Sequence, residues 1–154
     1  MKILKIGILT LIVLVSTTVG IGSVVAHPTS LVVTKADVQC LAKNIYMEAR
    51  GETLEGQIAV AQVTMNRVRS PQFRNTVCGV VYAPYQFSWT IDKTKRVRNM
   101  KAWQDAQKIA KAVLSNTVKL PNFNALYFHT HQVNPRWNRS KRIIAVIGNH
   151  IFYA

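Results

Sequence analysis

The spacing of apolar residues predicts a first helix that starts near Lys35. Apolar side chains recur there at intervals of three and four residues, which places them on one helical face; they are Val38, Leu41, Ala42 and Ile45. This helix should end near Ala49, because Gly51 is a natural residue just past a helix end.

Two more helices are predicted further along the chain. The second covers residues 54–69, where Thr53 can cap the first turn and Ser70-Pro71 should stop the last one. The centre of this helix is apolar on most sides, so we expect it to be buried. The third covers about 100–115, with an apolar inner face and lysines on the outer face.

The remaining segments lack a helical pattern. Residues 71–99 look irregular, with Pro84 and several aromatic residues. After Pro121 the pattern becomes strand-like, with Gly148-Asn149 as a turn, and the predicted strands are 125–128, 142–147 and 151–153. The sequence therefore predicts a mainly α, α+β fold, in which a helical body carries a small β element at its C-terminal end.

The N-terminal residues are typical of an export signal. Lys2 and Lys5 precede an almost uninterrupted apolar run over residues 6–21, and small or β-branched residues follow as far as Ala26. A charged start, an apolar centre and a small-residue exit predict a secretory signal peptide over residues 1–26.

An uncleaved membrane anchor is the alternative for this segment, since about 20 apolar residues can span a bilayer. Gly20 and Gly22 interrupt the run and favour cleavage. Residues 27–34 would then be a linker, and 35–154 would be a folded domain that works outside the cytoplasm, either secreted or in the periplasm or cell envelope.

The composition narrows the choice of partners. The 154 residues include 20 Lys and Arg but 6 Asp and Glu, a net charge of +14, and 49% of them are hydrophobic. This apolar fraction excludes a disordered basic tail, and the length fits one domain, which we expect to be a monomer. An exported basic domain indicates an anionic partner such as a cell-wall polymer or membrane surface, whereas the absence of a DNA- or RNA-binding signature argues against nucleic acid.

Cys40 and Cys78 are the only cysteines. In an oxidising compartment we expect them to form a structural disulfide, and the alternative is two buried free thiols.

The six acidic residues limit any mechanism driven by carboxylates, and Glu48, Glu52 and Glu55 lie close together. Glu48 falls in the last turn of the first predicted helix, where the helix dipole is negative. Burial and this dipole both favour a protonated carboxyl, which can act as a general acid on a glycosidic oxygen. Glu52 and Glu55 begin the next helix, and we expect them to bind substrate; the alternative is that they are surface acids that compensate the helix dipole. Arg50 is a candidate ion-pair partner for one of them.

A polar and aromatic cluster lies near the C-terminal end, comprising Tyr127, His129, His131, Asn134, Arg136 and Trp137. We interpret it as one wall of a sugar cleft, in which Tyr127 and Trp137 stack on sugar faces; the alternative is that both are core aromatics. His129-Thr130-His131 could begin a metal site, but Zn²⁺ needs further ligands, so we expect no metal.

The segment Gln86-Phe87-Ser88-Trp89 leaves a similar choice open. Either Gln86 and Ser88 bind acetamido groups of a sugar, or Phe87 and Trp89 simply pack in the core.

Several blocks of residues occur in a recognisable order: Cys40 to Glu48-Ala-Arg-Gly-Glu52, 55–68, 75–82, 86–89, 127–137 and 147–153. Together they cover nearly all of residues 36–153, and this region resembles the SleB/CwlJ cell wall hydrolase family. The resemblance implies a lysozyme-like, mostly helical fold, peptidoglycan as substrate, and a catalytic glutamate at the position of Glu48.

The resemblance also implies a mechanism similar to that of lytic transglycosylases. Glu48 would protonate the oxygen between N-acetylmuramic acid and N-acetylglucosamine, and would then take the proton from the muramic 6-hydroxyl, without a cofactor. An inverting hydrolase would need a second carboxylate about 6.5–9.5 Å away, from Glu52 or Glu55. The remaining alternatives are an N-acetylmuramoyl-L-alanine amidase and a non-catalytic wall-binding module.

Overall fold

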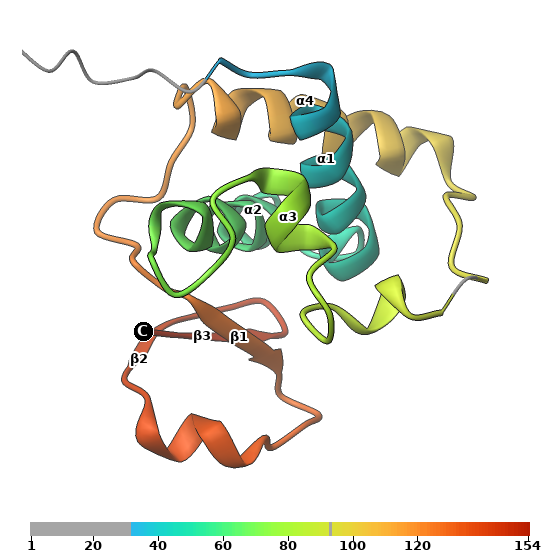
Figure 1. Ribbon diagram of the computed structural model, residues 1–154. Helices are drawn as coiled ribbons and strands as arrows, with labels where there is room; N and C mark the ends of the chain where they lie inside the picture. The colour runs from blue at the N-terminus through green and yellow to red at the C-terminus, as the bar shows by residue number, and fades with distance from the viewer. Residues whose placement is uncertain (1–31, 93) are drawn as a thin grey trace, which may run out of the picture. The chain divides into compact units, whose positions relative to one another are not determined.

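The computed structural model describes residues 32–92 and 94–154 (Figure 1). The predicted signal peptide and most of the predicted linker lie outside the described residues, and both stay predictions. The elements occur in the order α1 (Lys35–Ala49), α2 (Leu54–Arg69), α3 (Val77–Val81), η1 (Ser88–Thr90), α4 (Met100–Leu114), β1 (Tyr127–Thr130), η2 (Arg136–Ser140), β2 (Ile143–Ile147) and β3 (His150–Tyr153).

The three long helices begin and end where the sequence predicts. At the start of α1, Thr34 Oγ1 accepts a hydrogen bond from Asp37 N, and the Asp37 carboxylate accepts one from Thr34 N, which forms a capping box. Thr53 caps α2 as expected. Helix α1 ends at Ala49 with Arg50 as its C-cap, so Gly51 lies just past the helix end, as predicted. Its φ is not positive, since among the described glycines only Gly148 has a positive φ, and Glu52 N donates to Ala49 O at 2.9 Å across this turn.

Helix α2 has two buried faces. One face packs with α1, α3 and α4 in the larger core cluster, through residues such as Ile58, Ala61 and Met65. The other face carries Ala59, Val60 and Val63, which contact residues of the sheet and of the segment that leads to it. The prediction that α2 is buried is confirmed.

The prediction that residues 71–99 are irregular is wrong in part, because this segment contains α3 and η1. Thr76 caps α3 by accepting a hydrogen bond from Gly79 N at 3.1 Å. Val77, Val80 and Val81 recur at helical spacing and are all buried. A helix this short depends on tertiary packing rather than on its own propensity.

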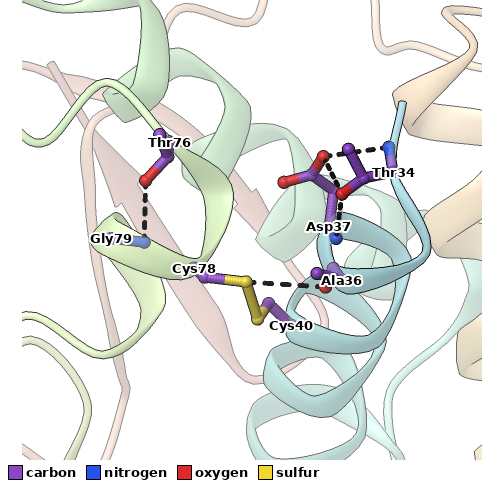
Figure 2. The surroundings of a disulfide bond; sticks show 7 residues. All are labelled: Thr34, Ala36, Asp37, Cys40, Thr76, Cys78 and Gly79. Atoms are coloured by element: carbon purple, nitrogen blue, oxygen red, sulfur yellow. Dashed lines mark hydrogen bonds between the residues drawn. A yellow bond between two sulfur atoms is a disulfide. The ribbon is translucent and has the colours of Figure 1, made fainter. Parts of the chain in front are cut away.

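A disulfide joins Cys40 of α1 to Cys78 of α3, and Figure 2 shows how it ties the two helices together. The sulfur of Cys78 also lies 3.5 Å from the carbonyl oxygen of Ala36. The predicted disulfide is confirmed.

The sheet is antiparallel, with strand order β1-β3-β2. The hairpin between β2 and β3 turns at Gly148, whose φ of 55° is accessible to glycine without strain. Strand β1 begins two residues later than predicted, because α2 side chains bind the backbone just before it: Asn66 Nδ2 donates to Phe123 O and to Ala125 O, both at 3.0 Å. The predicted α+β class, a helical body with a small C-terminal β element, is confirmed.

None of the helices in the described part of the chain has both the length and the apolar character needed to cross a membrane.

Candidate active site

Glu48 lies in the last turn of α1, and its side chain is half-buried. Burial raises the pKa of its carboxyl from 4.5 to about 7, and the positive charge of Arg67 offsets this shift only in part. The negative end of α1 acts in the same direction as burial. Near neutral pH Glu48 is therefore able to donate a proton, as the sequence predicts.

Arg67 of α2 is the cation that acts on Glu48, and it is only 6% exposed. Its Nε donates to Leu126 O at 2.7 Å. Its guanidinium carbon lies 5.2–6.0 Å from the centroids of three aromatic rings, those of Phe73, Phe87 and Tyr127. Burial lowers the pKa of Arg67 to about 10, so it stays cationic at neutral pH. Its Nη1 is buried and has no hydrogen-bond partner among the described residues.

Arg67 is absent from the site residues predicted from sequence. The signal that could have identified it is its position near the end of a helix that is otherwise apolar on most sides. An arginine on such a helix is buried with it, and a buried cation usually has a functional or structural role.

A cavity of about 830 Å³ lies beside Arg67 and collects most of the predicted substrate-binding residues. Its wall includes Gln86, Ser88, Tyr127, His129 and Trp137, and also several residues that were not predicted, among them Arg67, Gln72, Phe73 and Lys141. Glu48 does not belong to the described lining of this cavity. It is coupled to the cavity through the charge of Arg67.

Tyr127 and Trp137 lie side by side in this wall, with ring centroids 5.6 Å apart. Both are partly exposed rather than core residues. The ammonium of Lys141 lies 3.7 Å from the centroid of the Tyr127 ring. Aromatic faces and donors at the rim of a cavity are suited to binding a sugar chain.

His129 is more deeply placed than the other predicted wall residues, at 9% exposed. Its Nδ1 donates to Thr130 O at 2.9 Å, and its Nε2 lies 2.8 Å from the Tyr153 hydroxyl, within hydrogen-bonding distance. Because a carbonyl can only accept, Nδ1 carries a hydrogen. His129 therefore contributes its ring to the wall and holds Trp137, whose ring centroid lies 5.6 Å away.

Phe87 and Trp89 of the segment Gln86-Phe87-Ser88-Trp89 are buried, which confirms that they pack in the core. Gln86 and Ser88 line the cavity, and their binding to acetamido groups stays a prediction. Trp89 Nε1 also donates to the buried Asn44 Oδ1 at 3.3 Å.

The side chain of Glu52 forms hydrogen bonds within the folded chain. Its carboxylate accepts hydrogen bonds from Asn149 N and Asn149 Nδ2, each at 3.0 Å, and so ties the α1–α2 turn to the β2–β3 hairpin. These hydrogen bonds hold the pKa of Glu52 below its usual value. The position of Glu52 therefore favours a structural role over the substrate-binding role predicted for it.

Glu55 lies exposed in the first turn of α2, where its negative charge interacts favourably with the helix dipole. It is outside the described lining of the large cavity. The proposed ion pair of Arg50 with a glutamate is wrong, since the described ion pairs all involve Asp92 or Asp105. Arg50 instead donates to Tyr46 O at 3.3 Å.

Within residues 32–92 and 94–154, no three His, Cys, Asp or Glu side chains come together in a way that could hold a metal ion. His131, Asn134 and Arg136 are exposed and lie outside the described lining of the large cavity.

The chain matches one family model, described as Cell Wall Hydrolase, over residues 51–153. The match includes Glu52 and Glu55 and begins just after Glu48, so the case for Glu48 comes from its position and its pKa.

Among curated proteins, the chain is similar to the spore cortex-lytic enzymes of Oceanobacillus iheyensis and Bacillus subtilis, with 35% and 34% identity over 119 residues. Each alignment covers 75% of this chain, but 41% and 37% of the relative. The chain thus spans about two fifths of the length of the curated relatives it matches.

Two solved structures are also similar: the catalytic domain of the Bacillus cereus SleB protein, and the catalytic domain of the germination-specific lytic transglycosylase SleB from Bacillus anthracis. The TM-scores are 0.67 and 0.68, each at 34% identity. The matches cover 79% and 80% of this chain and 91% and 98% of the two domains.

Proposed function

The chain belongs to the cell wall hydrolase family, and on this premise we propose that it cleaves the glycan strand of peptidoglycan as a lytic transglycosylase. The bond cut would be that between N-acetylmuramic acid and N-acetylglucosamine, and Glu48 would be both acid and base. The observation that carries the proposal is the Glu48 carboxyl, whose pKa is raised to about 7.

In the first step the protonated Glu48 gives its proton to the glycosidic oxygen, and the bond from this oxygen to C1 of muramic acid breaks. Positive charge develops on the muramic ring, and Glu48 is left as a carboxylate. In the second step the 6-hydroxyl of the same sugar attacks C1, and Glu48 takes its proton. The products are a free N-acetylglucosamine 4-hydroxyl and a 1,6-anhydro ring, and Glu48 is protonated again.

A single-carboxylate cycle agrees with the surroundings of Glu48. An inverting hydrolase needs a second carboxylate as the base that activates water. Glu52 is occupied by two hydrogen bonds from Asn149, and Glu55 is exposed to solvent. Neither is placed in the described lining of the large cavity.

The large cavity supports the proposal by offering a surface for the sugar strand. We propose that Tyr127 and Trp137 stack on sugar faces, while Gln86 and Ser88 bind acetamido groups. Arg67 joins this wall to Glu48, because its charge lowers the pKa of Glu48 and its side chain lines the cavity.

Digestion of purified peptidoglycan, followed by mass spectrometry of the soluble products, tests the proposed function. We expect muropeptides that end in 1,6-anhydro-muramic acid, which is one water lighter than the reducing sugar. Reducing muramic ends would instead identify a hydrolase, free peptides would identify an amidase, and an intact wall would identify a binding module.

The pKa of Glu48 also predicts how the activity depends on pH. Because burial raises this pKa, the active protonated form is present below about pH 7 and is lost above it. The value of kcat/KM should fall about tenfold for each pH unit above this pKa. We would measure it from about pH 5 to about pH 9 at constant ionic strength, since binding of a basic protein to an anionic wall is salt-dependent. A rate that still rises at the alkaline end would contradict the assignment of Glu48 as the acid.

We also propose that the domain acts outside the cytoplasm, as a monomer on an anionic envelope. The Cys40–Cys78 disulfide supports export, because such bonds persist in oxidising compartments. The net charge of the whole sequence is +14, of which Lys2 and Lys5 in the predicted signal peptide contribute two charges, and the excess of basic residues that remains supports attraction to the envelope.

A further inference from the structure

A second cavity, of about 340 Å³, lies between the last turn of α1 and the segment 94–99 that leads into α4. We call it the basic hollow, because Arg50, Lys95, Arg96 and Arg98 line it together with Tyr46, Met47, Thr94 and Asn99. No carboxylate belongs to its described lining.

The wall of the basic hollow is held in place by Tyr46, which is 2% exposed. The Tyr46 hydroxyl accepts hydrogen bonds from Arg98 N and Asn99 N, both at 3.0 Å. The guanidinium of Arg50 lies 5.2 Å from the centroid of the Tyr46 ring. One buried side chain therefore holds the backbone at Arg98 and Asn99 on one side of the hollow and packs against Arg50 on the other.

Most of these cations have no anionic partner. Lys95 lies 3.9 Å from Asp92, but within the described residues Arg50, Arg96 and Arg98 form no ion pair. Four positive charges around one small cavity repel each other, and a bound anion would relieve that repulsion. The adjacent start of α4 adds to the positive potential, since its first turn holds no acidic residue.

The basic hollow and Glu48 share the last turn of α1, since Met47 and Arg50 line the hollow and flank Glu48 in the sequence. At about 100° per residue, the side chains of Glu48 and Arg50 leave the helix on opposite faces. A peptide that runs from a sugar at Glu48 to the hollow would therefore pass around the end of α1.

We propose that the basic hollow binds a free carboxylate of the peptide that muramic acid carries, an inference that rests on the proposed function. The amino sugars of the glycan are uncharged, whereas the stem peptide bears carboxylates and is attached to the sugar whose C1 reacts. A carboxylate within two or three residues of that sugar can reach on the order of 10 Å from it. An anion held in the hollow would thus position the muramic acid at Glu48 and select strands that carry charged peptides.

The test compares two forms of one substrate: glycan strands with native stem peptides, and the same strands after carbodiimide coupling to ammonia. The coupling converts carboxylates to carboxamides and leaves the peptide length unchanged. We expect the wild-type protein to prefer the native strands, and the double variant Arg96→Gln/Arg98→Gln to lower the native-to-amidated ratio of kcat/KM about fivefold. Circular dichroism and thermal unfolding would verify that the variant is folded.

The matched control is Lys111→Gln/Lys119→Gln, which removes the same charge from exposed positions outside the hollow and should leave the ratio unchanged. Equal ratios in the wild type and the Arg96/Arg98 variant would overturn the proposal. The proposal would also be overturned if the Arg96/Arg98 variant lost binding only to walls that retain a phosphodiester polymer, because the hollow would then bind phosphate rather than a peptide carboxylate.

Co-sedimentation with insoluble native and amidated peptidoglycan measures the same preference without cleavage. A wild-type protein that prefers native walls but releases no anhydro-muropeptides would contradict the proposed function and support the basic hollow. A protein that releases anhydro-muropeptides equally from native and amidated peptidoglycan would support the proposed function and contradict the proposal for the basic hollow.

Discussion

Glu48→Gln should lower the release of anhydro-muropeptides by roughly 10³–10⁴-fold. Glutamine keeps the shape of the side chain, but it can neither donate the first proton nor accept the second. Because one residue performs both transfers in the proposed cycle, the loss should lie at the upper end of the range for general acid–base catalysis. The measurement is the rate of appearance of 1,6-anhydro products by mass spectrometry, and activity within tenfold of wild type would contradict the assignment.

Glu55→Gln is the matched control, since it makes the same chemical change at an exposed glutamate on the next helix. If Glu55 activated water, as an inverting hydrolase would require, its replacement would abolish activity. In the single-carboxylate mechanism, only the Glu48 variant loses activity.

The stability of the Glu48 variant separates a catalytic defect from misfolding. Burial raises the pKa of Glu48 from 4.5 to about 7, so between these values the native state binds more protons than the unfolded state. The free energy of unfolding of the wild type therefore falls as pH rises through this window, by roughly 3 kcal/mol in total. Glu48→Gln has no such titration, and above pH 7 it should be at least as stable as the wild type.

The sequence predicted the long helices well because their signals are local. The apolar spacing in α1 and the predicted cap at Thr53 each act within a few residues, whereas the cap at Thr34 was not predicted. Helix α3 was missed because it is short and depends on contacts with α1, through the disulfide and buried valines. The start of β1 was misplaced for a related reason: Asn66 binds the backbone of residues far along the chain.

The candidate site shows the same division between local and distant causes. Burial raises the pKa of Glu48, and its place at the end of a helix, which the sequence does predict, acts in the same direction. The role of Glu52 could not be predicted, because its partner Asn149 is distant in sequence and close only in the folded chain. The surroundings of Arg67 are also non-local, since the ring of Tyr127 and the carbonyl of Leu126 come from the C-terminal part.

The disulfide should make the largest single contribution to stability. It joins residues separated by 38 positions and closes a loop that contains all of α2. On the chain-entropy model, such a loop closure stabilises the fold by roughly 3–4 kcal/mol. This is a large share of the total of about 5–15 kcal/mol that is typical of a domain. Helix α3 is the element most exposed to its loss, because five residues form no stable helix without tertiary contacts.

Cys40→Ala/Cys78→Ala is therefore expected to lower the free energy of unfolding by roughly 3–4 kcal/mol, measured by urea denaturation. Hydrogen exchange should rise first in α3, which leads into the Gln86–Ser88 wall of the large cavity, so activity should fall at temperatures where the wild type is still active. Reduced wild-type protein is the control, because it loses the bond but keeps both sulfur atoms, and it should be destabilised by a similar amount. If the double variant and the reduced wild type both unfolded at the same urea concentration as the oxidised wild type, the disulfide would not be what holds α3 on α1.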